Sequence, residues 1–128
     1  MDEIGETVFQ IIFSDLSAAE MARLPKALQL EIMSEFQVMP EDLNAGSSGE
    51  KFGVLRRGSE TFHRFRTRDY RIYFQKTNVG VVVRRVLHRN TLQDFLFRAN
   101  LPVGEDEALQ GNAAFWRLID EGGGPKNI

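Results

Sequence analysis

Residues 61–88 read TFHRFRTRDYRIYFQKTNVGVVVRRVLH, and this stretch decides the fold class. Aromatic and β-branched residues alternate in it with basic ones, which is the two-residue period of a strand with two different faces. Two polar dipeptides, at 68–69 and 77–78, interrupt the alternation as turns. We therefore expect strands at 61–67, 70–76 and 80–88, joined as antiparallel hairpins, and a further strand at 52–57 before a turn at 58–59.

The chain before these strands predicts one more strand and two helices. Residues 7–13 (TVFQIIF) are typical of a strand, and a capping-box pattern at 17–20 predicts a short helix that ends before Pro25. Pro25 begins a second helix, and residues 40–50 form a loop rich in turn-forming residues. The second helix carries one apolar stripe of four residues, Leu28, Ile32, Met33 and Phe36.

The order of these elements predicts an α+β fold, in which an N-terminal strand and an α-helical hairpin pack on a mainly antiparallel sheet. Residues 89–100 fit either a strand or a helix. Residues 105–120 predict an extra C-terminal helix with three acids in its first turn, which Gly111 weakens. The glycine-rich residues 122–125 predict a flexible tail.

Composition excludes several classes of protein. The 128 residues, of which 42% are hydrophobic and 27% charged, fit one globular domain. The absence of cysteine excludes disulfides, a thiolate metal site and a cysteine nucleophile, and the two histidines lack metal-ligand spacing. We expect no metal and no small-molecule cofactor. The acidic first residues and the short apolar runs favour a cytoplasmic protein with no membrane partner.

Charge is unevenly distributed along the chain. Residues 51–98 hold twelve Lys or Arg and three acids, whereas residues 1–50 carry a net charge of −8 and residues 99–128 a net charge of −3. Such a local excess of positive charge attracts polyanions, although solvated strands can also carry it.

The strand pattern predicts that the basic residues converge. Side chains two apart on a strand share a face, so Arg64 and Arg66 project opposite Phe65, and Arg71 and Tyr73 project opposite Ile72. If the helical hairpin covers the apolar face, the other face is an open basic surface with an exposed Tyr73 that can stack on a base. Clustered guanidinium groups need an anion, and their geometry favours the phosphates of a nucleic acid.

Three segments resemble the RelE/ParE superfamily of toxins from type II toxin–antitoxin systems. Residues 9–25 (FQIIFSDLSAAEMARLP) are similar to the first strand and helix of the family, residues 63–74 (HRFRTRDYRIYF) to its arginine-rich signature, and residues 86–95 (VLHRNTLQDF) to its C-terminal motif. The resemblance spans about residues 7–98. It implies a toxin domain over 1–100 and a C-terminal extension over 101–128.

The resemblance implies a metal-independent endoribonuclease that cleaves mRNA on the ribosome and so inhibits translation. In this chemistry the ribose 2′-oxygen attacks the adjacent phosphate, and a cognate antitoxin protein neutralises the enzyme. The catalytic positions of the family fall on Arg64, Arg66, Arg71, His88 and Arg89. Further contacts to the nucleic acid are expected from Arg68, Tyr73, Arg85 and Phe95.

The sequence departs from the family where proton transfer is concerned. Phe95 stands where the family often has a tyrosine, and arginine is a poor general base because it stays protonated. Histidine is the residue type whose unperturbed pKa is nearest neutrality, which leaves His88 and His63 as candidates for proton transfer, and the position of His63 in its strand favours the core.

Two alternatives stay open. One is a ParE-like protein that inhibits DNA gyrase without cleaving nucleic acid. The other is an inactive RNA-binding relative, in which the acids at 105–107 fold back onto the arginines. The C-terminal helix is also explained by simple packing of four apolar residues on the body, Leu109, Phe115, Trp116 and Ile119.

Overall fold

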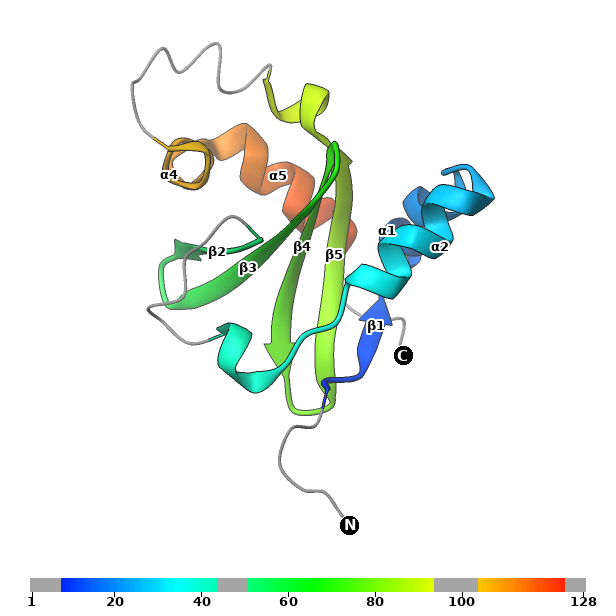
Figure 1. Ribbon diagram of the computed structural model, residues 1–128. Coiled ribbons are helices and arrows are strands. Elements are labelled where there is room, and N and C mark those ends of the chain that lie inside the picture. Colours follow the sequence, from blue (N-terminus) through cyan, green and yellow to red (C-terminus); the bar gives the residue numbers. More distant parts are fainter. Residues whose placement is uncertain (1–7, 44–50, 94–103, 124–128) are drawn as a thin grey trace.

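The structure is a computed structural model that describes residues 8–43, 51–93 and 104–123 (Figure 1). The described strands form a five-stranded sheet with the order β1-β5-β4-β3-β2. β1 lies parallel to β5, and all other neighbours are antiparallel. The sheet consists of β1 (Ile11–Phe13), β2 (Phe52–Arg57), β3 (Glu60–Thr67), β4 (Tyr70–Thr77) and β5 (Gly80–His88). The predicted α+β class and mainly antiparallel sheet are confirmed.

Helices lie on both sides of this sheet (Figure 1). The N-terminal hairpin consists of α1 (Asp15–Ala22) and α2 (Lys26–Glu35), and the short η1 (Pro40–Leu43) follows it. Residues 89–93, for which strand and helix were both open, are helical. The C-terminal pair consists of α4 (Glu105–Gln110) and α5 (Ala113–Gly122). No helix among the described residues is both long and apolar enough to cross a membrane.

Two separate apolar clusters hold these layers together. Ile32 and Phe36 of the hairpin pack on Phe65, Ile72 and Phe74 of the sheet. On the other face, sheet residues pack against the C-terminal helices through Leu55, Phe62, Tyr73, Leu109, Phe115, Trp116 and Ile119. The packing expected of the four C-terminal apolar residues is therefore confirmed. The expectation of an open basic face is wrong, because α4 and α5 cover it.

The start of α1 differs from the prediction. The N-cap is Ser14, whose hydroxyl oxygen accepts from the Ser17 amide at 3.2 Å. The Ser17 hydroxyl donates instead to the Val83 carbonyl at 3.0 Å, which docks α1 on β5. Glu20, the expected partner in the capping box, is occupied by β5, as described below. Met33 of the predicted apolar stripe is 40% exposed, so it does not belong to the core that this stripe was expected to form.

The predicted C-terminal helix is in fact two helices. α4 ends at Gly111, and Asn112 begins α5 by accepting from the amides of Ala114 and Phe115 at 2.8 and 3.1 Å. The weak helical propensity of glycine and the strong N-capping by asparagine explain the break. It allows the acidic α4 and the apolar α5 to follow different directions across the sheet (Figure 1).

Candidate functional site

Three arginines and one tyrosine share the sheet face beneath the C-terminal helices. Arg64 pairs directly with Tyr73, and Arg66 pairs with Arg71, across the β3–β4 ladder. The convergence predicted from strand alternation is thus confirmed. We call this set, Arg64, Arg66, Arg71 and Tyr73, the arginine face.

Two carboxylates of α4 bind two of these arginines. Asp106 accepts from Arg64 Nε at 3.1 Å and from Nη2 at 2.8 Å. Glu105 accepts from Arg71 Nε at 2.9 Å and from Nη2 at 3.3 Å. Both are fork-to-fork ion pairs, and the arginine side chains are only 4% and 10% exposed. In this form the two guanidinium groups are therefore committed to the chain's own acids.

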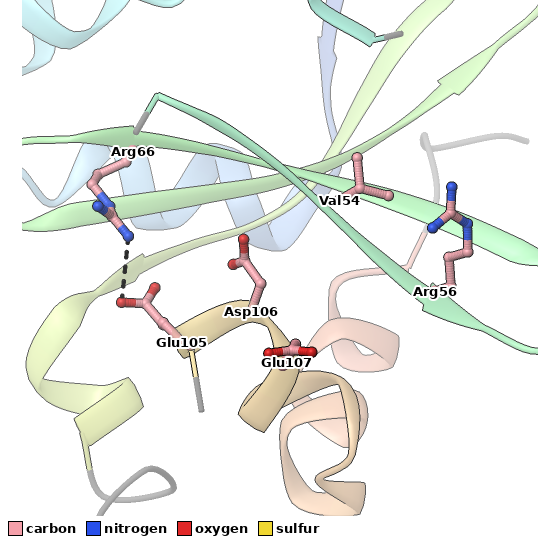
Figure 2. A pocket seen from close by; sticks show the side chains of 7 residues that line it. Val54, Arg56, Arg66, Glu105, Asp106 and Glu107 are labelled. Atoms are coloured by element: carbon pink, nitrogen blue, oxygen red, sulfur yellow. Dashed lines mark ion pairs between the residues drawn. The ribbon is translucent and has the colours of Figure 1, made fainter. Parts of the chain in front are cut away.

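Arg66 is the most accessible member of the arginine face. Its Nη2 lies 3.8 Å from Glu105 Oε1, and the side chain is 36% exposed. Its Nε is buried and has no hydrogen-bond partner among the described residues. Figure 2 shows the pocket beside it, about 380 Å³ in volume, with Arg56 and Arg66 on the strand side and the acids at 105–107 on the other.

Several contacts hold α4 over the arginine face. Leu109 is fully buried, and the Gln110 side-chain oxygen accepts from the Arg56 amide on β2 at 2.7 Å. The indole N–H of Trp116 donates to the Gln110 carbonyl at 2.8 Å. On β2, a Cβ at Gly53 would overlap Asp106 Oδ2 and Arg64 Nη2. A glycine inside a strand often marks the close approach of another segment. Gly53 therefore indicated that something packs on β2 here, which the alternation of strand residues does not show.

Tyr73 is fully buried, so the expectation of an exposed ring that stacks on a base is wrong. Its ring packs edge-on against Phe115, with centroids 5.1 Å apart. The hydroxyl has no hydrogen-bond partner among the described residues. Burial raises the pKa of Tyr73 far above its usual range, and the nearby carboxylates of Glu105 and Asp106 raise it further.

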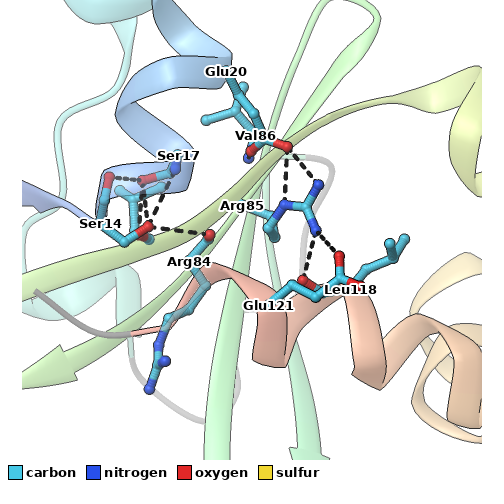
Figure 3. Close-up of polar contacts among 9 residues, drawn as sticks. Ser14, Ser17, Glu20, Arg84, Arg85, Val86, Leu118 and Glu121 are labelled. Atoms are coloured by element: carbon cyan, nitrogen blue, oxygen red, sulfur yellow. Dashed lines mark hydrogen bonds and ion pairs between the residues drawn. The ribbon is translucent and has the colours of Figure 1, made fainter.

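Arg85 cross-links three elements instead of facing a ligand (Figure 3). Its Nε and Nη2 donate to Glu20 Oε2 at 2.9 and 2.6 Å, and its Nη1 donates to the Leu118 carbonyl at 2.7 Å. Glu20 Oε1 also accepts from the Val86 amide at 2.8 Å. The predicted contact of Arg85 with nucleic acid is therefore not available in this form, because the side chain ties α1 and α5 to β5.

The remaining predicted arginines lie away from the arginine face. Arg68 pairs with Glu31 and Glu35 of α2, each at 3.2 Å. Arg89 is 53% exposed and its Nε lies 3.4 Å from Asp69 Oδ1. Phe95 lies outside the described residues. The structure thus brings together three of the predicted catalytic arginines, and places Arg89 beside the β3–β4 turn.

Both histidines belong to the face that the hairpin covers. His88 contacts Tyr70 edge-on at 5.0 Å, and its Nδ1 accepts from the Asn90 amide at 3.0 Å. His63 stacks on Phe74 at 5.4 Å, as its strand position predicts, and burial followed by the charge of Arg56 lowers its pKa. Neither imidazole is on the face that carries the paired arginines.

Comparison with protein-family models, with curated proteins and with solved structures yields no match to this chain. In the part of the chain that the structure describes, no cluster of His, Asp and Glu could hold a metal ion. What the site offers chemically is a pair of guanidinium forks, each fitted to a planar or tetrahedral oxyanion.

Proposed function

We propose that this protein binds RNA through the phosphates of its backbone at the arginine face, and that α4 competes with RNA for that face. This is the RNA-binding alternative within the RelE-like resemblance.

The observation that carries the proposal is the pair of ion pairs, Arg64–Asp106 and Arg71–Glu105. A guanidinium fork that binds a carboxylate through two parallel N–H groups binds a phosphate in the same way. The two acids of α4 therefore occupy positions that suit two phosphate groups. Arg56 and Arg66 line the adjoining pocket, where a strand of RNA can make its first contacts before α4 moves.

Cleavage of mRNA is the second candidate function, and the resemblance alone motivates it. Attack by a ribose 2′-oxygen needs a group that accepts its proton, and arginine does not serve at physiological pH. Since His63 and His88 are on the opposite face, binding is better supported than cleavage. The cognate antitoxin and the ribosome remain predicted partners on the same basis.

The test measures the affinity of the full chain for a fluorescent single-stranded RNA by anisotropy. The double variant Glu105→Gln/Asp106→Asn keeps the shape of α4 but removes both charges that oppose RNA. We expect at least a tenfold gain in affinity, equivalent to about 1.4 kcal/mol, with a steep dependence on salt. The matched control is Asp15→Asn/Glu41→Gln, which changes the net charge equally at two exposed residues away from the arginine face.

An equal gain in both variants would show that net charge alone attracts RNA, and would contradict the proposal. The same samples, incubated with mRNA with and without ribosomes, test cleavage. Intact mRNA beside tight binding supports the binding function, whereas cleavage that Arg71→Ala abolishes would favour the ribonuclease. Inhibition of gyrase supercoiling without RNA binding would favour the ParE-like alternative.

A further inference from the structure

We call the arrangement in which α4 covers the arginine face the closed form. In the closed form the Tyr73 hydroxyl is fully buried and has no hydrogen-bond partner among residues 8–43, 51–93 and 104–123, although buried hydroxyls in folded proteins nearly always find a partner. A phenylalanine would fill the same space against Phe115 without this cost. The closed form by itself therefore does not explain why a tyrosine occupies this position.

The hydroxyl lies among the charged groups of the arginine face. Tyr73 is directly across the ladder from Arg64 and two residues along β4 from Arg71. All four charged groups of the two ion pairs act on its ionisation: the two carboxylates raise the pKa of Tyr73, and the two guanidinium groups lower it. The hydroxyl is thus close to the position where the carboxylates meet the arginines.

We propose that the Tyr73 hydroxyl is the third member of the anion site, and that it donates a hydrogen bond to a phosphate oxygen when RNA replaces α4. This inference rests on the proposed function. A carboxylate has two oxygens in one plane, and a guanidinium fork engages both of them. A phosphodiester also has two charged oxygens, but it is tetrahedral, and each charged oxygen can accept a further hydrogen bond from outside the plane of the fork, which the Tyr73 hydroxyl can donate.

This assignment adds a positioning residue to a face that has no histidine. A guanidinium fork fixes a phosphate by its charge, whereas a hydroxyl on a packed ring also fixes its rotation. Tyr73 has the rigidity for this task, because its ring is enclosed by Phe115 and by the neighbouring strands.

The test places Tyr73→Phe in the full-length Glu105→Gln/Asp106→Asn background and measures the affinity for single-stranded RNA. We expect the affinity to fall by about tenfold, because a hydrogen bond to a charged oxygen is lost. Tyr70→Phe is the matched control, since Tyr70 packs on the hairpin side, and it should leave the affinity unchanged. In the otherwise unaltered chain, Tyr73→Phe should raise the thermal midpoint by a few degrees, since it removes an unpartnered buried group.

The outcomes separate this inference from the proposed function. RNA binding in the background variant that Tyr73→Phe does not weaken overturns the role of Tyr73 and leaves the arginine face as the binding site. Failure of the background variant to bind RNA overturns both. A lower thermal midpoint for Tyr73→Phe in the unaltered chain shows that the hydroxyl already has a partner, and this also overturns the inference.

Discussion

Replacing Gly53 by alanine tests whether α4 closes the arginine face, because it alters no charge. Gly53 lies on β2 directly across from Arg64. A Cβ there would overlap Asp106 Oδ2 and Arg64 Nη2 and lie 2.9 Å from Arg64 Cζ. The ion pair that fixes α4 must therefore shift or break. Alanine suits a strand better than glycine does, so any loss of stability arises from this contact and not from the strand itself.

The atoms that the Cβ would overlap are the ends of two side chains, and Asp106, which is 23% exposed, can move aside. The expected loss is then that of the charge-assisted hydrogen bonds to Arg64, about 1.5–3 kcal/mol. Taking about 2 kcal/mol, the thermal midpoint of a chain of this size should fall by roughly 6–10 °C. If the packing of α4 over the arginine face is weakened by the same free energy, the apparent affinity for RNA should rise by roughly 30-fold. The upper limit is the affinity of the chain with α4 displaced. One substitution should therefore lower stability and raise binding together.

Differential scanning calorimetry and RNA anisotropy on the same preparation measure the two effects. Gly111→Ala is the control, because no atom outside its immediate surroundings lies closer than 3.9 Å to a Cβ built there. It should not raise the affinity for RNA, and any change in the thermal midpoint should be upward, because alanine favours helical backbone more than glycine does. If Gly53→Ala lowers the thermal midpoint with no gain in affinity for RNA, α4 does not compete with RNA for the arginine face.

Three further substitutions test the packing around the site. Gly122→Ala should destabilise the chain by about 1–3 kcal/mol in urea unfolding, because its Cβ would overlap the carbonyl oxygen of Arg84 on β5; an unchanged midpoint would show that α5 does not pack there. Glu20→Gln should lower the free energy of unfolding by about 3 kcal/mol, because it leaves the buried charge of Arg85 poorly paired. A loss below about 1 kcal/mol would show that this ion pair is as weak as one on the surface. His63 has a lowered pKa, so the unfolded chain binds a proton that the folded chain does not. Stability should therefore fall as the pH drops below 6.5, and His63→Phe should flatten this dependence in calorimetric scans; an equal slope in both proteins would contradict the assignment.

Strand alternation was sufficient to predict which side chains share a face. The register puts Arg64 opposite Tyr73 and Arg66 opposite Arg71, while Phe65 pairs with Ile72 on the other side. Such a prediction needs only the period of two and correctly placed turns, and both are local properties of the sequence. The strand bounds at 52–57 and 80–88 agree for the same reason.

Contacts between segments far apart in the sequence decide which helices cover each face of the sheet. The alternation of residues within a strand gives no information about these contacts. The acids at 105 and 106 meet arginines about 34 to 42 positions earlier in the chain. The helix break at Gly111 and Asn112, which lets α4 and α5 lie differently, is a capping effect that a single apolar period hides. Similarly, the Ser17 hydroxyl and the Glu20 carboxylate fit a capping box, but contacts with β5 take both groups.

The segregation of charge along the chain is compatible with two outcomes, and the burial of the charged side chains shows which one occurs. A basic block between acidic ends attracts an external polyanion if the blocks stay apart, or it neutralises itself if they fold together. Here acids from the N-terminal part, Glu20 and Glu31, and from the C-terminal part, Glu105 and Asp106, each meet an arginine of the central block. Arg64 and Arg71 are too enclosed to bind RNA while α4 is in place. Under the proposed function, the affinity for RNA is therefore the intrinsic affinity of the arginine face reduced by the free energy of closure, and weakening the α4 contacts should raise it.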